Sequence, residues 1–135
     1  MTFFESGPVR MEFQYLSGKL EGPARSYYEN GSLKGERFYQ NGLPRGSARE
    51  FFVSGKIRSE WAYSDGKREG KWVEYYESGN VLSEWIYHRG KPEGLAREYH
   101  ENGQVKVVGS FKNGKQEGVT RTYDENGILI REWYF

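Results

Sequence analysis

Residues 79–103 read GNVLSEWIYHRGKPEGLAREYHENG. A glycine stands at each end of this stretch and two more, Gly90 and Gly94, divide it, so a helix of ordinary length has no room. The segments between glycines are rich in Val, Trp, Ile and Tyr, which favour strands, and the stretch ends on Asn-Gly, a strong hairpin signal. The stretch therefore predicts a pair of short antiparallel strands.

The same arrangement recurs along the whole chain with a fixed period, the interval from Gly79 to Gly103. Of the 18 glycines, only Gly35 and Gly109 fall outside three series that share this spacing. The series are Gly7, Gly31, Gly55, Gly79, Gly103 and Gly127; Gly18, Gly42, Gly66, Gly90 and Gly114; and Gly22, Gly46, Gly70, Gly94 and Gly118. A fixed period of this size indicates a repeat array in which each unit packs against its neighbours.

These observations predict one all-β domain over residues 1–135. Strands such as 56–63 and 71–76 would follow one another in an elongated, single-layer, twisted antiparallel meander of about eleven strands. Units would start at Gly7, Gly31, Gly55, Gly79 and Gly103, with a partial unit from Gly127.

The register depends on the turns. If both turns of a unit are two-residue loops, the second-strand Arg of one unit lies opposite the first-strand Glu of the next. The predicted pairs are Arg25 with Glu36, Arg49 with Glu60, and Arg121 with Glu132. The same register puts Val81, Trp85 and Tyr87 on one face with Ala96 and His100, and Glu84 and Arg97 on the other. Small residues such as Ala48 would face the Trp positions and leave space for the indoles.

Composition excludes several classes of function. The 20 basic and 19 acidic residues nearly cancel, which removes any general electrostatic case for nucleic acid. There is no cysteine, and the two histidines, His88 and His100, have no partner at metal-ligand spacing. We therefore expect no enzyme activity, no cofactor and no metal. Membrane lipid is disfavoured because lysines such as Lys67 are followed two residues later by an acid.

Residues that break the repeat are better candidates for recognition than residues that follow it, because structural needs recur in every unit. Trp72 stands where other units have Ala or Thr, and Val73 stands where they have Arg. Trp72 would then lie with Trp61 and Trp85 in the middle of the array. The predicted partner-binding residues are Trp61, Trp72, Val73, Trp85, His88 and Arg89.

The last strand, residues 128–135, is apolar and has no proline, charged tail or capping helix. Such an edge offers unpaired backbone groups to another chain. We predict that it forms a homodimer or a complex with a partner protein. The residues assigned to this edge are Leu129, Arg131, Trp133 and Phe135.

Two motifs carry a resemblance to a known family. Residues 84–94 read Glu-Trp-x-Tyr-x-x-Gly-Lys-x-Glu-Gly, and residues 96–103 read Ala-Arg-Glu-Tyr-x-Glu-Asn-Gly. With the glycine spacing, they resemble the MORN-repeat variant, and more particularly the bacterial family of YwqK-type antitoxins. The resemblance implies an elongated sheet of hairpins, a protein-binding or scaffolding surface, and a role in neutralising a toxin. Departures are Arg37 and Gly109 in place of the first-strand aromatic, and Val108 in place of its Glu.

The leading hypothesis is therefore a non-enzymatic protein-binding repeat module, an antitoxin or immunity-like inhibitor of a partner protein. Two alternatives stay open: glycan or cell-wall ligand binding through exposed aromatic platforms, and a scaffold that only self-associates. The first ten residues contain no apolar run, so we expect no signal peptide and a cytoplasmic location. That expectation counts against the glycan alternative.

Overall fold

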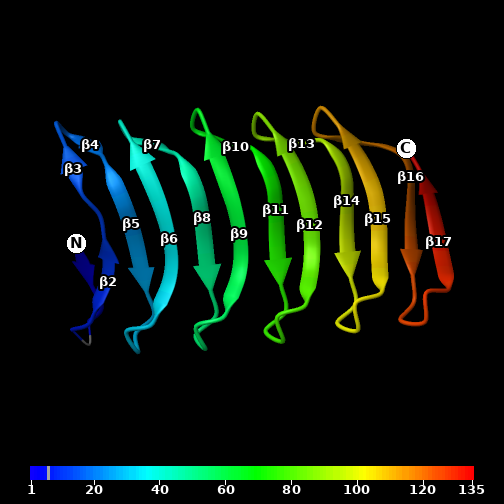
Figure 1. The fold of residues 1–135 in the computed structure, drawn as a ribbon, viewed down its shortest axis with the longest axis horizontal. Helices are drawn as coiled ribbons and strands as arrows, with labels where there is room; N and C mark the ends of the chain where they lie inside the picture. Colours follow the sequence, from blue (N-terminus) through cyan, green and yellow to red (C-terminus); the bar gives the residue numbers. More distant parts are fainter. Residues whose placement is uncertain (6) are drawn as a thin grey trace.

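The computed structural model describes residues 1–5 and 7–135, and within them it is an all-β fold with no helix. The strands lie side by side in a single layer, with the N-terminus at one end of the sheet and the C-terminus at the other (Figure 1). Neighbouring strands of the sheet follow one another in the sequence and pair antiparallel. The predicted single-layer antiparallel meander is confirmed.

Twelve strands form the main path of the sheet among the described residues. They are β1 (Thr2–Phe3), β2 (Val9–Glu12), β5 (Gly22–Tyr27), β6 (Leu33–Gln40), β8 (Gly46–Phe51), β9 (Ile57–Ser64), β11 (Gly70–Tyr75), β12 (Val81–His88), β14 (Gly94–Tyr99), β15 (Val105–Lys112), β16 (Lys115–Tyr123) and β17 (Leu129–Tyr134). Five two-residue strands lie beside the turns at the upper edge of Figure 1: β3 (Tyr15–Leu16), β4 (Lys19–Leu20), β7 (Leu43–Pro44), β10 (Lys67–Arg68) and β13 (Lys91–Pro92).

The turns at the upper edge are two-residue loops, as predicted. In the turn after β12, Arg89 has φ 49° and Gly90 has φ 83°. Positive φ at both central residues is the requirement of the type I′ turn, whose twist matches that of the flanking strands. Three of these turns are also tied to the turn before them by a glutamate carboxylate that accepts a main-chain N–H: Glu21 accepts that of Asn41 at 2.8 Å, Glu69 that of Arg89 at 2.7 Å, and Glu93 that of Asn113 at 2.8 Å.

The loops at the lower edge are one residue longer, and here the two-residue assumption is wrong. The Tyr76 carbonyl accepts the N–H of Gly79, while the Tyr76 N–H donates to the carbonyl of Asn80. Gly79 has φ 95°, so residues 77–79 form a three-residue loop that closes with a glycine bulge. Equivalent hydrogen bonds close the loops after Tyr28, Phe52, His100 and Asp124.

The longer loop shifts the register at the start of each first strand. Glu74 lies opposite Ser83 but Tyr75 lies opposite Val81, so Leu82 has no partner across the pair. Val81 therefore shares a face with Tyr75, and not with Trp85 as we predicted. The other half of the strand keeps the predicted register, with Trp72 opposite Trp85.

A continuous row of charged residues crosses the sheet on one face, which we call the charged face. Arg25 lies opposite Glu36, Arg49 opposite Glu60, and Arg121 opposite Glu132, so all three predicted pairs are confirmed in register. The row runs Glu12, Arg25, Glu36, Arg49, Glu60, Val73, Glu84, Arg97, Val108, Arg121, Glu132. Acid and base alternate along it except at the two valines.

The opposite face, which we call the aromatic face, holds most of the buried residues. Ala48 lies opposite Trp61, as the small-residue rule predicted, and the two are 1% and 6% exposed. Among the described residues no large side chain is fully buried. The fold therefore depends on ladder hydrogen bonds and cross-strand side-chain pairs more than on a closed interior.

Side chains at the lower edge join consecutive units. The Tyr28 hydroxyl donates to the carbonyl of Phe51 at 2.7 Å, and the Tyr76 hydroxyl donates to the carbonyl of Tyr99 at the same distance. His100 Nε2 lies 2.9 Å from the carbonyl of Tyr123. His100 lies just beyond β14 and takes the place of these tyrosines, so its role is structural. Within the described range, no helix is long and apolar enough to cross a membrane.

Candidate binding surfaces

The central tryptophans share the aromatic face but differ in exposure. Trp72 lies directly opposite Trp85, and both are half-buried. The Trp85 ring packs against Phe111 with centroids 5.0 Å apart. Trp72 has no ring contact with another aromatic among the described residues, whereas Trp61 and Trp85 each pack against one.

Trp61 is a packing residue, which corrects its assignment to the partner-binding set. The guanidinium groups of Arg37 and Arg68 lie over its ring at 5.4 and 5.6 Å from the centroid, and Tyr63 packs against its edge. These groups cover the indole and leave it 6% exposed. Its Nε1 is buried and has no hydrogen-bond partner within the described part of the chain.

Val73 is removed from the partner-binding set for two reasons. It lies on the charged face, opposite Glu60 and Glu84, and therefore on the other side of the sheet from Trp72. Its side chain is also 7% exposed. Trp72 and Val73 both break the repeat and are adjacent in sequence, but they lie on opposite faces of the sheet.

His88 and Arg89 are exposed at the upper edge, away from the tryptophans. They line a groove together with Asp65, Lys67 and Glu69. His88 Nδ1 lies 2.8 Å from one carboxylate oxygen of Glu69, whose other oxygen accepts the Arg89 N–H. The Arg89 amide, and then the His88 imidazole, lower the pKa of Glu69 below its ordinary value. This carboxylate is therefore occupied by the turn and is not free for acid–base chemistry.

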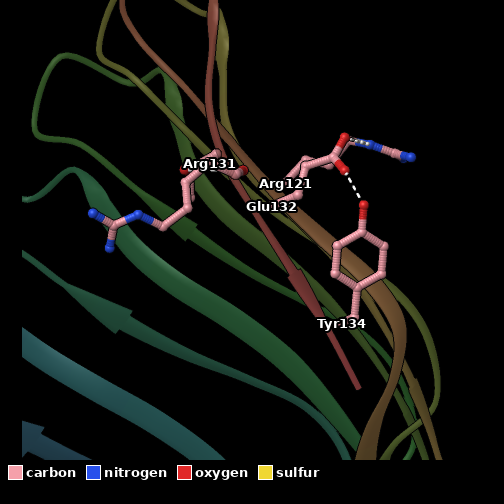
Figure 2. A network of polar contacts seen from close by, with 5 residues as sticks. Arg121, Arg131, Glu132 and Tyr134 are labelled. Carbon is pink, nitrogen blue, oxygen red and sulfur yellow. Dashed lines mark hydrogen bonds and ion pairs between the residues drawn. The ribbon is translucent and has the colours of Figure 1, made fainter.

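The edge strand β17 combines an apolar surface with one polar network. It pairs with β16 on one side only within the described residues. Glu132 accepts from the Tyr134 hydroxyl at 2.6 Å and from Arg121 at 3.1 Å, and these two contacts lower the pKa of Glu132. Figure 2 shows Arg131 pointing away from this network, and its guanidinium lies 5.4 Å from the centroid of the Trp133 ring.

The four predicted edge residues are all exposed, but the register separates one of them. Trp133 and Arg131 lie opposite Thr120 and Thr122 on the aromatic face. The register shift between Leu129 and Arg131 sets Leu129 opposite Tyr123 instead, on the charged face. Phe135 is 61% exposed, and its N–H donates to the carbonyl of Gly118.

Both glutamates that lie opposite Val73 have other partners. Glu60 accepts the Tyr75 hydroxyl at 2.6 Å. Glu84 accepts the Tyr99 hydroxyl at 3.2 Å and pairs with Lys71 at the same distance. The bond to Glu60, followed by burial, raises the pKa of Tyr75 to about 12.

The valine at position 108 has the opposite surroundings. Val108 lies opposite Arg97 on one side and Arg121 on the other. An open cavity of about 280 Å³ lies here, lined by Arg97, Gln104, Val105, Val108, Tyr123 and Gly127. The sequence prediction did not include this site. The sequence shows that Val108 departs from the repeat. It does not show that Arg97 and Tyr123 lie around this position.

The described residues contain no cluster of three or more side chains with the ligand types of a metal site. The polar groups that meet closely are the turn carboxylates, the cross-strand ion pairs and the tyrosine–glutamate pairs. Each of these contacts recurs with the repeat or closes a turn.

The profile described as MORN repeat variant matches residues 20–41, 68–89, 92–113 and 116–135, which together make up more than half of the chain. The chain belongs to the MORN repeat variant family. The MORN repeat matches cover the stretch from β10 to the end of β17 almost without interruption, and the family is compatible with a binding repeat module.

Solved structures show weaker likeness. A mutant of TarM from S. aureus is 15% identical, with a TM-score of 0.48, covering 80% of this chain and 21% of that chain. The GtfA/B complex is 14% identical, with a TM-score of 0.42, covering 94% of this chain and 21% of that chain. This chain thus spans about a fifth of the length of either structure. Among curated proteins, no match was found.

Proposed function

We propose that this MORN repeat protein is a non-enzymatic binding module whose role is to bind and inhibit a toxin-like partner protein. The supporting observation is the amount of apolar surface that a single-layer sheet leaves uncovered. Sixteen large hydrophobic residues are exposed in the described part of the chain, among them Ile86, Leu95 and Trp133. Exposed apolar surface of this kind is typical of interaction sites.

The edge strand β17 concentrates this surface. Ile130 is 63% exposed, Tyr134 75% and Phe135 61%. A strand with one unpaired backbone edge can add a strand of another chain, which provides main-chain hydrogen bonds as well as apolar contacts. The partner we propose therefore pairs with β17, and a second copy of this chain can use the same edge.

The test is capture of a partner by the purified chain from the native cell, compared among three variants. Ile130→Lys adds a charge to the exposed edge, and Trp72→Ala removes the indole that has no aromatic ring contact. We expect both variants to stay folded and to weaken the complex, Trp72→Ala by about 2 kcal/mol if it is a hot spot. Glu29→Gln, in an exposed lower loop, is the control that should change neither property.

Inhibition is tested by expressing the captured protein with and without this chain. We expect growth arrest by the partner alone and rescue by the wild-type chain, with less rescue by Ile130→Lys. The absence of any captured protein, together with a Trp fluorescence change on titration with millimolar saccharide, would replace this proposal with the glycan alternative. Self-association without a second protein would replace it with the scaffold alternative.

A further inference from the structure

The repeat shows how this sheet holds a carboxylate on its charged face. A tyrosine donates to a glutamate that precedes it by a constant spacing: Tyr27 to Glu12 at 3.0 Å, Tyr75 to Glu60 at 2.6 Å, and Tyr99 to Glu84 at 3.2 Å. An arginine bonds a glutamate that follows it, again at a constant spacing: Arg25 to Glu36 at 2.6 Å, and Arg121 to Glu132 at 3.1 Å. Each of these glutamates is therefore bonded by one donor of fixed spacing, either the tyrosine or the arginine.

At position 108 both donors are present and the carboxylate is absent. Arg97 precedes Val108 by the same spacing that separates Arg25 from Glu36, and Tyr123 follows it by the spacing that separates Glu60 from Tyr75. Both side chains line the cavity at Val108. In the part of the chain that the structure describes, neither the Arg97 guanidinium nor the Tyr123 hydroxyl makes a hydrogen bond or an ion pair with a side chain or the backbone.

The nearby acids do not fill this gap. Glu84 lies opposite Arg97 on its other side, but it is bonded by Tyr99 and Lys71 and makes no ion pair with Arg97. Glu132 belongs to Arg121 and Tyr134. The region around Val108 thus has an uncompensated positive charge, although the whole chain carries a formal charge of only +1.

We propose that this cavity binds the side chain of a glutamate from a partner polypeptide, whose carboxylate takes the place that Val108 leaves empty between Arg97 and Tyr123. This inference rests on the proposed function, since it specifies what part of a bound protein the charged face contacts. Arg97 supplies a charge-assisted hydrogen bond and Tyr123 a neutral one, and each is a donor type that bonds glutamates elsewhere on this face.

A glutamate side chain fits the lining better than a bare anion. Val105 and Val108 supply apolar surface on which its two methylene groups can pack. Tyr99 and Val105 lie opposite each other, so Val105 is held on the charged face beside this site. The protein's own occupants of the equivalent positions, such as Glu60 and Glu84, are glutamates as well.

The experiment is a titration of the full chain, followed by the backbone amide shifts in NMR spectra, with N-acetyl-L-glutamate N-methylamide as the probe. The corresponding glutamine derivative is the neutral control. We expect the glutamate probe to shift the amides of residues 97, 105, 108 and 123, and the glutamine probe to leave them in place. Arg97→Gln should weaken the binding about tenfold or more, and Tyr123→Phe about threefold.

Val108→Glu provides the sharpest variant, because it fills the site from within. We expect this variant to fold as the wild type does and to show no shift with the probe. Arg49→Gln is the matched control: Arg49 belongs to the same row and flanks Glu36 and Glu60, so this variant should bind the probe as the wild type does.

Unchanged binding in Val108→Glu, or equal shifts with the glutamine probe, would overturn the proposal. Equal or stronger shifts with inorganic phosphate would overturn it in favour of a general anion site, and stronger shifts with N-acetylglycine in favour of a chain-terminal carboxylate. Protein capture that persists while the probe fails to bind would remove this inference alone. Probe binding without any protein capture would remove the proposed function and leave the cavity as a carboxylate site.

Discussion

Val73 and Val108 both interrupt the charged row, but their surroundings differ. Val73 replaces an arginine between two glutamates, and Tyr75, Tyr99 and Lys71 bond those glutamates instead. Val108 replaces a glutamate, and among the described residues Arg97 and Tyr123 beside it have no substitute acceptor. A lost base can be replaced by the hydroxyl and ammonium groups of neighbouring strands, whereas a lost acid needs another carboxylate. The same residue therefore closes the surface at one position and leaves a cavity at the other.

The substitution of each valine by glutamate tests this comparison directly, and Val73→Glu should have the larger effect. It would place a third carboxylate between Glu60 and Glu84 at a position that is 7% exposed. Burial of an unpaired charge beside like charges should reduce the free energy of unfolding by about 3 kcal/mol at pH 7. Urea denaturation measures this, and Val73→Ile is the control for shape. A stability equal to that of the wild type would show that Val73 is not enclosed.

Gly109→Ala tests whether the open cavity reflects loose packing throughout unit five. A Cβ at Gly109 would lie 2.7 Å from the Thr120 hydroxyl oxygen on the aromatic face, where Thr120 is 5% exposed. We expect a loss of about 1–2 kcal/mol in the free energy of unfolding because Thr120 must move. Thr120→Ala should reverse most of this loss in the double variant. No loss in Gly109→Ala would mean that both faces of this region are loosely packed.

The Tyr75 hydroxyl can be followed through pH. Its pKa of about 12 in the folded protein lies above the ordinary value of 10.0, so the stability it provides is complete below pH 10 and is lost as the pH rises toward 12. The expected loss is about 1–2 kcal/mol with solvent screening. Tyr75→Phe should not show this part of the alkaline loss. Parallel pH profiles for wild type and variant in thermal unfolding would contradict the assignment.

Val108→Glu should have the smallest effect on stability, with the opposite sign to Val73→Glu. The new carboxylate would meet Arg97, Arg121 and Tyr123 on a partly exposed surface. We expect the free energy of unfolding to rise by about 0.5 kcal/mol, the usual size of a cross-strand ion pair. Because screening weakens such pairs, the gain should shrink at molar salt concentration. A loss of stability would show that the donors are not arranged around position 108.

The sequence alone determined the architecture and half of the register. Because the glycine series repeat at one fixed interval, they predict the units, the antiparallel order and the upper two-residue turns, where Asn-Gly and Asp-Gly pairs adopt positive φ easily. The pairs of Arg25 with Glu36 and Arg121 with Glu132 lie across the lower loops, where the bulge restores the register that a two-residue turn would give. Local backbone preferences were sufficient for these features.

Only the tertiary structure decided the faces near the lower loops and the state of each site. The third loop residue adds a bulge, which moves Val81 and Leu129 to the charged face, and the residue pattern of the loop did not show this addition. Burial of Trp61 depends on Arg37 and Arg68 from other strands. The cavity at Val108 depends on donors that lie well before and well after it in the sequence, which only the strand pairing brings together. The sequence shows that Val108 replaces a glutamate of the repeat. Only the neighbouring strands determine whether another acceptor takes the place of that glutamate.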